Sequence, residues 1–168
     1  MGLEQAQTGK LLPPDRDRSA MLLQRIDHVG YAVEDLEEAI GYHQRLYGAE
    51  VAHRETMERD GVREALIAVG DSFLQLLEPL RDDPPVAKFL ERNGGPGVHH
   101  VGYGVQDVAA TLEDLKDMGV RVVDDVPRHG SRGCIVAFLH PKGAMGVLVE
   151  LVEDPALVTA ATETVHDA

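Results

Sequence analysis

The feature that most constrains the fold of this chain is an internal repeat. Residues 27–36 recur as residues 99–108 with their order intact, so that His28 matches His100 at an offset of 72 positions. A second echo places Gln75 opposite Glu150 at an offset of 75. Two echoes at nearly one spacing indicate a duplicated unit of about half a domain, and 168 residues suffice for one domain with a substantial core.

Both copies carry the same pattern of secondary structure. A strand of alternating character (25–33 and 98–105) is followed by an aspartate that can cap a helix, and Asp35 has Glu38 three residues on, as in a capping box. Gly48 and Gly119 stand where the two helices are expected to end. The further predicted strands are 50–58, 62–69, 72–80, 121–123, 134–139 and 146–152, with a linking helix at 84–92 and a loop at 129–133.

This pattern predicts an α+β fold in which two tandem βαβββ modules form a curved mixed sheet around a cleft. The expected boundaries are a disordered N-terminal extension at 1–22, a single domain at 23–154 and a C-terminal tail at 155–168. Within the domain, module one is expected at about 24–82, the linking helix at about 84–93 and module two at about 97–153.

Charge and cysteine content limit the possible functions. The formal net charge of −13 argues against nucleic-acid binding, which needs a basic face, and against adhesion to anionic membranes. The single cysteine, Cys134, excludes an intrachain disulfide and fits a reducing cytoplasm, where we expect the protein to reside. No stretch reaches the roughly 18 apolar residues of a membrane span, and the N-terminal residues lack the apolar core of a signal peptide. The negative charge does not exclude an anionic small-molecule substrate, because a local basic patch or a metal can outweigh a distant negative field.

The two equivalent strands each place a histidine among unusually small neighbours. Because alternate side chains of a strand share a face, Ile26, His28 and Gly30 are expected on one face, with His100 and Gly102 on the equivalent face of the repeat strand. Either histidine alone is typical of a hydrogen-bonded core residue. The symmetry indicates instead that the two imidazoles converge on the floor of the cleft. By the same alternation, the neighbouring His99 is expected to face away.

Gln75 and Glu150 occupy matching positions on matching strands. Gln75 alone is typical of a surface strand, but Glu150 stands in the apolar run 146–152, where an ionised carboxylate is costly unless it is paired or bound to a metal. Two imidazoles, one amide oxygen and one carboxylate, without a thiolate, suit Co²⁺, Mn²⁺, Ni²⁺ or Zn²⁺. The sequence thus predicts a metal-containing cleft with His28, Gln75, His100 and Glu150 as ligands.

Paired modules with ligands at these positions resemble the vicinal oxygen chelate superfamily of glyoxalases, bleomycin-resistance proteins and dioxygenases. Within it, the chain is most similar to the methylmalonyl-CoA epimerase family, from about Gln24 to Glu153. The resemblance rests on segments 27–29, 60–65, 74–79, 97–101, 138–143 and 146–151. The chain departs from the family at 143–145, where a more polar pair is expected, and this puts the acyl preference in doubt.

The resemblance implies an epimerase that interconverts (2S)- and (2R)-methylmalonyl-CoA by proton transfer at C2 through a metal-stabilised enolate. It implies Co²⁺ as the first metal to expect, Glu64 as a catalytic base that is not a ligand, and Glu150 as a ligand that doubles as second candidate base. By itself, Glu64 is typical of a solvated strand residue. Arg128, Arg132 and Lys142 are candidates for contacts with the coenzyme A phosphates, and the family alone implies a homodimer.

Two other functions stay open. A glyoxalase-I-like lyase or isomerase would use the same four ligand positions. A metal-free drug-binding protein of the bleomycin-resistance kind would need an aromatic-lined groove, whereas aromatic residues make up only 4% of this chain. Cys134 fits a small core residue better than a nucleophile, because no partner motif accompanies it.

Overall fold

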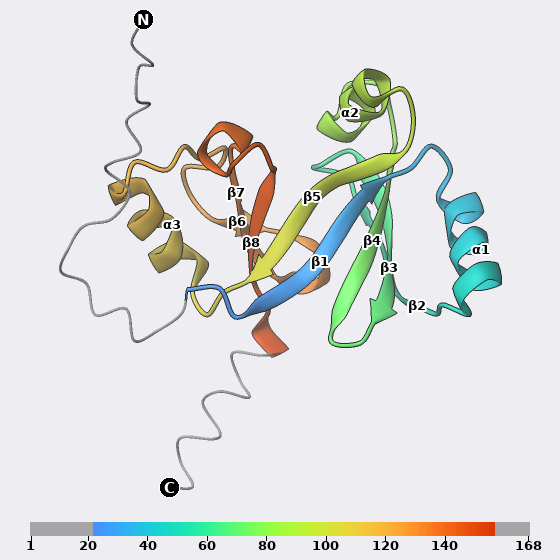
Figure 1. Cartoon of the computed structure of the whole chain (residues 1–168), viewed down its shortest axis with the longest axis horizontal. Helices are drawn as coiled ribbons and strands as arrows, with labels where there is room; N and C mark the ends of the chain where they lie inside the picture. The colour runs from blue at the N-terminus through green and yellow to red at the C-terminus, as the bar shows by residue number, and fades with distance from the viewer. Residues whose placement is uncertain (1–21, 157–168) are drawn as a thin grey trace, which may run out of the picture.

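One continuous eight-stranded sheet forms the centre of the protein (Figure 1). The structure is a computed structural model that describes residues 22–156. The strands are β1 (Arg25–Ala32), β2 (Val51–Met57), β3 (Val62–Val69), β4 (Ser72–Pro79), β5 (Gly97–Gly104), β6 (Arg128–His129), β7 (Ile135–Leu139) and β8 (Val149–Glu153). The helices are α1 (Leu36–Tyr47), α2 (Pro85–Asn93) and α3 (Val108–Asp117), with 3-10 turns η1 (Ser131–Gly133) and η2 (Pro141–Gly143). The expected N-terminal extension and C-terminal tail fall almost entirely outside the described residues.

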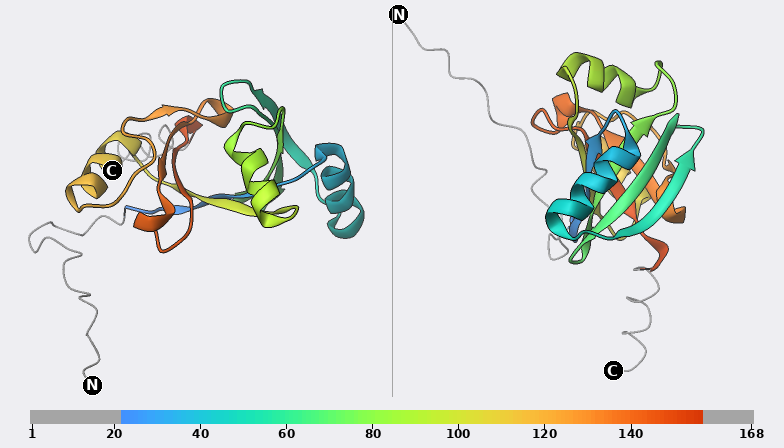
Figure 2. Two further views of the ribbon diagram at one scale, coloured as in Figure 1. Left: turned by 90° about the horizontal axis from the view of Figure 1, so that it is seen from above. Right: turned by 90° about the vertical axis from the view of Figure 1, so that its right-hand side faces the viewer.

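Each half of the sheet is one βαβββ module, as the repeat predicts. The spatial order is β2-β3-β4-β1-β5-β8-β7-β6. The pairs β1–β4 and β5–β8 are parallel and the other neighbouring pairs are antiparallel, so the sheet is mixed. The first strands of the two modules, β1 and β5, pair at the centre. Figure 2 shows the sheet curling between α1 and α3, which lie at its opposite ends. The predicted α+β fold with a curved mixed sheet is confirmed.

In each module, the second echo of the repeat ends in a strand glutamate whose side chain binds the N-terminus of the helix. Glu78 accepts a hydrogen bond from the backbone N–H of Leu36 at 2.8 Å, and Glu153 accepts one from the backbone N–H of Val108 at 2.9 Å. Both carboxylates thereby satisfy a free donor at the positive end of a helix dipole. Asp35 adds the predicted N-cap, accepting from a first-turn N–H at 2.8 Å. The last strand of each module is therefore tied to that module's own helix.

Each module has its own apolar core under its helix. α1 buries Ile40 against Ile67 and Leu76, and α3 buries Leu112 against Leu151. Alternate residues of the same strands, such as Leu66, face the other way and line a cavity. α1 and α3 therefore cover one side of each module, and the site lies on the other side, where α2 packs against Leu77. No helix within residues 22–156 is long and apolar enough to cross a membrane.

The strand predicted at 121–123 is wrong. Val122 makes only an isolated bridge to Leu139, and the edge strand β6 lies instead at Arg128–His129, across the start of the predicted loop. The carboxylate of Asp124 accepts the backbone N–H of Phe138 at 2.9 Å. A side chain thus takes a hydrogen bond that a paired strand would have made, which ends the ladder here.

Simple alternation also fails at the start of β1. The pairing of β1 with β5 shifts register between Ile26 and His28, as at a β-bulge. Ile26 is 49% exposed, whereas Asp27 is fully buried. The prediction that Ile26 shares the buried face of His28 is therefore wrong, and the bulge brings an extra carboxylate inside.

Candidate active site

Two rows of residues cross the central strands in register. The first row is Gln75 of β4, Gly30 of β1 and His100 of β5, and the second is His28 of β1, Gly102 of β5 and Glu150 of β8. In each row a glycine separates a histidine from an oxygen-bearing side chain. The approximate twofold relation between the modules makes the second row the counterpart of the first, and this places all four predicted ligands at the centre of one sheet.

The two glycines make room for the histidine rings. A Cβ atom built on Gly30 would lie 2.3 Å from Cε1 of His100, and one built on Gly102 would lie 2.4 Å from Cε1 of His28. Each imidazole therefore lies directly over the glycine of the neighbouring strand. The small neighbours seen in the sequence are the reason that two rings fit on the cleft floor.

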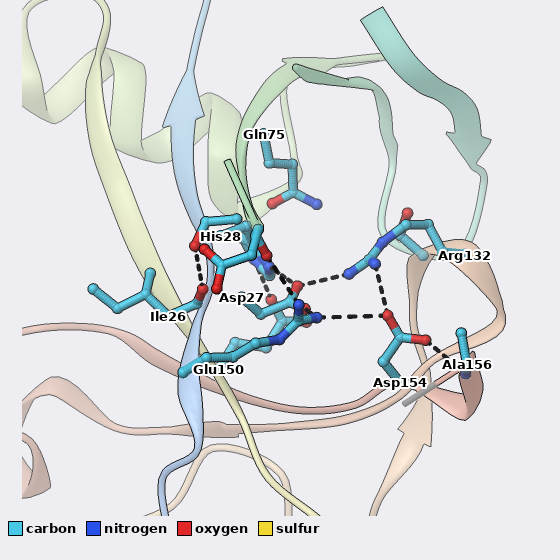
Figure 3. A network of polar contacts seen from close by, with 12 residues as sticks. Ile26, Asp27, His28, Gln75, Arg132, Glu150, Asp154 and Ala156 are labelled. Atoms are coloured by element: carbon cyan, nitrogen blue, oxygen red, sulfur yellow. Dashed lines mark hydrogen bonds and ion pairs between the residues drawn. The ribbon is translucent and has the colours of Figure 1, made fainter. Parts of the chain in front are cut away.

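Three of the predicted ligands meet at one point. The Nε2 atoms of His28 and His100 are 2.9 Å apart, and Glu150 Oε2 lies 2.9 Å from the first and 3.2 Å from the second. All three side chains are buried, and their donor atoms lie within 4.8 Å of one another. In Figure 3 the amide of Gln75 points toward this group from β4. The structure thus brings together the donors that the repeat singles out.

The state of Gln75 provides an independent test of whether the group suits a cation. Its Nε2 donates to Oε2 of Glu64 at 2.7 Å, while its buried Oε1 has no hydrogen-bond partner within the described residues. An unpaired buried acceptor costs free energy, and a metal ion would satisfy it. With two imidazole nitrogens and a carboxylate beside it, this donor set fits a divalent metal. The identity of the ligands and of the metal stays a prediction.

Burial and hydrogen bonds within the cluster shift the pKa values of its three side chains. Burial opposes ionisation of His28, but hydrogen bonds to Asp27 and Glu150 outweigh burial and raise the pKa of His28 to about 9. Burial likewise opposes the carboxylate of Glu150, yet hydrogen bonds from His100 and His28 hold the pKa of Glu150 below its usual range. Burial lowers the pKa of His100. The two carboxylates therefore favour a proton on His28, and a metal ion bound by this histidine would displace that proton.

A polar network supports His28 from behind. Asp27 Oδ1 lies 2.9 Å from Nδ1 of His28 and 2.6 Å from a guanidinium nitrogen of Arg132, while Oδ2 pairs with Arg25. Arg132 also holds Asp154 at 3.0 Å, so a loop and the end of β8 join the same network (Figure 3). Such second partners fix the tautomer and orientation of a metal-binding histidine.

Glu64 lies beside the cluster on β3. It is only 2% exposed; one carboxylate oxygen accepts from Gln75, and the other contacts the hydroxyl of Ser131. Burial raises the pKa of Glu64, and the two hydrogen bonds only partly oppose this effect. A buried carboxylate with raised pKa is a better proton acceptor than a solvated one. The solvated-residue interpretation of Glu64 is therefore wrong.

The cluster and Glu64 open into one cavity of about 740 Å³. Leu66, Leu77 and Phe138 supply apolar wall, and the buried Cys134 also lines it. Burial raises the pKa of the Cys134 thiol to about 11, so it is a protonated packing residue. The combination of apolar walls with a few convergent polar groups is typical of a small-molecule site.

One expected phosphate contact is wrong. The guanidinium of Arg132 is directed inward to Asp27 and Asp154, so it is committed to the network behind His28. Arg128 lines the cavity, but it pairs with Asp60 at 3.2 Å and with Asp124 at 3.4 Å. A contact of Arg128 or Lys142 with the coenzyme A phosphates stays a prediction.

The repeat held a signal that sequence reasoning missed. Asp27 and His99 occupy equivalent positions, each directly before a cluster histidine. His99 Nδ1 lies 3.0 Å from Nδ1 of His100, just as Asp27 contacts Nδ1 of His28. His99 also lines the cavity, so the prediction that it faces away is wrong. Ser131 had no comparable signal, because its loop shows no periodicity.

Comparison with known proteins finds relatives of similar sequence and fold. The chain is 40% identical over 131 residues to the ethylmalonyl-CoA/methylmalonyl-CoA epimerase of Cereibacter sphaeroides, covering 77% of this chain and 98% of that protein. A solved structure of a methylmalonyl-CoA epimerase in complex with methylmalonyl-CoA is 48% identical, with a TM-score of 0.75 and coverage of 80% and 96%. The epimerase from Mycobacterium tuberculosis is 38% identical, with a TM-score of 0.77 and coverage of 86% and 99%.

A family model also matches residues 27–138, which include three of the four predicted metal ligands and Glu64. With the duplicated modules, the shared cleft and relatives of this identity, the chain belongs to the Glyoxalase/Bleomycin resistance protein/Dioxygenase superfamily.

Proposed function

We propose that this protein is a metal-dependent epimerase that interconverts (2S)- and (2R)-methylmalonyl-CoA by proton transfer at C2. One observation carries the proposal: the buried carboxylate of Glu64 lines the same cavity as the His28, His100 and Glu150 cluster and accepts a hydrogen bond from the neighbouring Gln75. Two relatives that match this chain over most of their length have names that include methylmalonyl-CoA epimerase. The glyoxalase-like and drug-binding alternatives have no comparable observation in their favour.

The mechanism assigns a separate task to each group. His28, Gln75, His100 and Glu150 would hold the metal, which when bound supplies Lewis-acid stabilisation of negative charge on substrate oxygen, a contribution of several kcal/mol. Glu64 removes the C2 proton on one face of the substrate, and Glu150 is the candidate that handles the proton on the other face. The apolar walls exclude water from the carbanionic centre. Co²⁺ is the metal we expect first.

Cations at the mouth of the cavity suit the coenzyme A phosphates. Arg59, Lys88 and Arg92 line the cavity, are exposed, and form no ion pair within the described residues. They come from the β2–β3 turn and from α2, so they form one side of the entrance. Within a chain of net charge −13, such unpaired cations are the groups best placed to attract a polyanion.

The remaining assignments concern the molecule as a whole. We propose that residues 23–154 act as one domain, because β1 and β5 join both modules in a single sheet. We propose a homodimer, in which a second copy covers apolar side chains of the central strands such as Ile26 and Val98, which are 49% and 50% exposed. The lone buried Cys134 supports a cytoplasmic location.

Deuterium uptake at C2 of (2S)-methylmalonyl-CoA in D₂O tests the proposal. The Co²⁺-loaded protein is expected to exchange the proton and to generate the 2R form well above a no-protein control. Glu64→Gln is expected to keep its metal content and to exchange about 10²–10⁴-fold more slowly. Wild-type protein that binds Co²⁺ yet exchanges no faster than the control would rule the function out.

A further inference from the structure

A second set of polar contacts leads from Glu64 away from the cleft. β2 pairs antiparallel with β3 so that Glu55 stands directly opposite Glu64. The hydroxyl of Ser131 bridges the two carboxylates: it contacts Oε1 of Glu64 and lies 3.4 Å from Oε2 of Glu55. His53, two residues before Glu55 on the same strand, places its Nε2 3.0 Å from that oxygen. The four side chains form a continuous row of proton donors and acceptors.

This row runs from the interior to solvent. Glu64 is 2% exposed, whereas the side chains of Glu55 and His53 are 36% and 35% exposed. β2 is an edge strand, so its side chains reach bulk water. The backbone N–H of Arg132 also donates to Oε2 of Glu55 at 3.1 Å, which holds the carboxylate toward the loop that carries Ser131.

The other hydrogen bond of Glu64, from the amide of Gln75, cannot carry a proton away. Its second oxygen accepts from the amide of Gln75, and an amide N–H donates without taking up a proton. Within the described residues, the route through Ser131 is therefore the hydrogen-bonded path from Glu64 toward water. A base that takes a proton from one face, while another group delivers a proton to the other face, is left protonated and has to be reset before the next turnover.

We propose that Glu55, with His53, returns to solvent the proton that Glu64 takes from the substrate, a role that rests on the proposed epimerase function. Protonated Glu64 gives its proton to Oγ of Ser131 while the serine hydroxyl passes its own proton to Oε2 of Glu55. One O–H bond breaks and one forms at the serine oxygen, so Glu64 becomes a carboxylate and Glu55 a carboxylic acid. Glu55 then gives the proton to Nε2 of His53 or to water, and no electrons are exchanged with any other group.

A relay and a purely structural role predict different kinetics. Resetting Glu64 occurs after product has left, so a slower reset lowers kcat and leaves kcat/KM unchanged. If Glu55 merely anchored the loop of Ser131, its loss would misplace Ser131 against Glu64 during proton abstraction, and kcat/KM would fall with kcat. The split between the two constants therefore separates the hypotheses.

The test measures epimerisation of (2S)-methylmalonyl-CoA by the Co²⁺-loaded wild type, by Glu55→Gln and by Glu58→Gln, a matched control on an exposed glutamate in the turn directly after the same strand. Glu55→Gln is expected to lower kcat at least about 10-fold, to keep kcat/KM within about twofold, and to recover kcat when imidazole buffer is added as an external proton carrier. Glu58→Gln is expected to match the wild type.

Three outcomes overturn the relay. If kcat and kcat/KM of Glu55→Gln fall together and imidazole has no effect, Glu55 is a structural anchor. If neither constant changes while the wild type turns over normally, the proton leaves by another path. If the Co²⁺-loaded wild type itself does not epimerise, the proposed function fails and the relay fails with it, which distinguishes that case from the first two.

Discussion

The glycines between the paired donors offer a sharp test of the cleft geometry. Gly30→Ala and Gly102→Ala each add one methyl group, and neither glycine has a positive φ, so the backbone accepts alanine at both positions. The added Cβ would lie 2.3 Å from Cε1 of His100 in the first variant and 2.4 Å from Cε1 of His28 in the second. The perturbation therefore acts on the rings and leaves the strand intact.

The size of the effect follows from these distances. Ordinary contact begins at 3.4 Å, so each ring has to retreat by about 1 Å. His28 resists this movement because Asp27 and Glu150 each hold one of its nitrogens at 2.9 Å. A displacement of about 1 Å can cost about 10²-fold in catalysis, and loss of support around a metal-binding histidine costs about 10–100-fold in affinity. We expect each variant to bind Co²⁺ about 10–100-fold more weakly than the wild type.

Isothermal titration with Co²⁺ measures this loss, and circular dichroism checks that the variants fold. Gly41→Ala serves as the control, because its Cβ would meet only the end of the flexible Arg45 side chain on α1. This control should bind Co²⁺ normally and gain about 0.5–1 kcal/mol in free energy of unfolding, since alanine replaces glycine within a helix. Folded cleft variants that bind Co²⁺ with wild-type affinity would refute the placement of the two rings over the glycines.

Three further predictions concern the network, the cavity wall and the core. Asp27→Asn removes the charge that pairs with two arginines and should lower the free energy of unfolding by about 3 kcal/mol in urea titrations. This value is at the low end for a buried pair, because Asp154 remains as a partner for Arg132. A loss under 1 kcal/mol would contradict the pairing. The Cys134 thiol, with its pKa raised from 9.0 to about 11, should react with a disulfide reagent at pH 8 about 10²-fold more slowly in the native than in the unfolded protein. Since the unfolded thiol ionises first, the free energy of unfolding should fall as pH rises from 9 to 11, and equal reaction rates in the two states would contradict the burial. Leu112→Ala in the fully buried core under α3 should cost about 2–5 kcal/mol by denaturant unfolding, and a cost near zero would show that α3 does not pack as described.

The predictions from sequence that are confirmed depend on local rules or on the repeat. Capping and periodicity place the ends of α1 well: Asp35 caps its start, and Gly48 ends it in the left-handed region at φ 63°. The equivalence of the two modules predicts that the four donor side chains lie near one another, because equivalent strands carry them. Once His28 and His100 lie on adjacent central strands, the parallel partners β4 and β8 bring Gln75 and Glu150 into the same two rows.

The parts that were missed depend on contacts between distant residues. Arg132 reaches Asp27 across 105 positions, and Ser131 reaches Glu64 across 67. Both residues stand in a short loop without periodicity, so their partners are determined by where β7 places the loop over module one. The bulge between Ile26 and His28 is similarly invisible, because it arises from pairing with β5. Tertiary placement decides these details, and a single sequence carries no pattern for them.

The duplication is symmetric for the donors but asymmetric for the acid–base group. Glu64 pairs with Leu77 of β4, and Val136 pairs with Val152 of β8 at the equivalent position of module two. The counterpart of the buried base is therefore a valine. An inversion at C2 needs proton transfer on both faces of the substrate, so the second proton cannot come from the symmetry mate of Glu64. This leaves the second face to Glu150 in the proposed mechanism, although a carboxylate beside a dication is a weaker base.

The same comparison explains why a proton route would serve only one side. Glu55 stands opposite Glu64 in the β2–β3 pair, and Arg128 stands opposite Val136 in the β6–β7 pair. A guanidinium stays charged at any physiological pH and cannot accept a proton. Module two thus has valine and arginine at the positions of the proposed base and the proposed relay. The duplicated scaffold is thus symmetric where the candidate metal ligands converge and asymmetric where the proposed mechanism treats the two faces of the substrate differently.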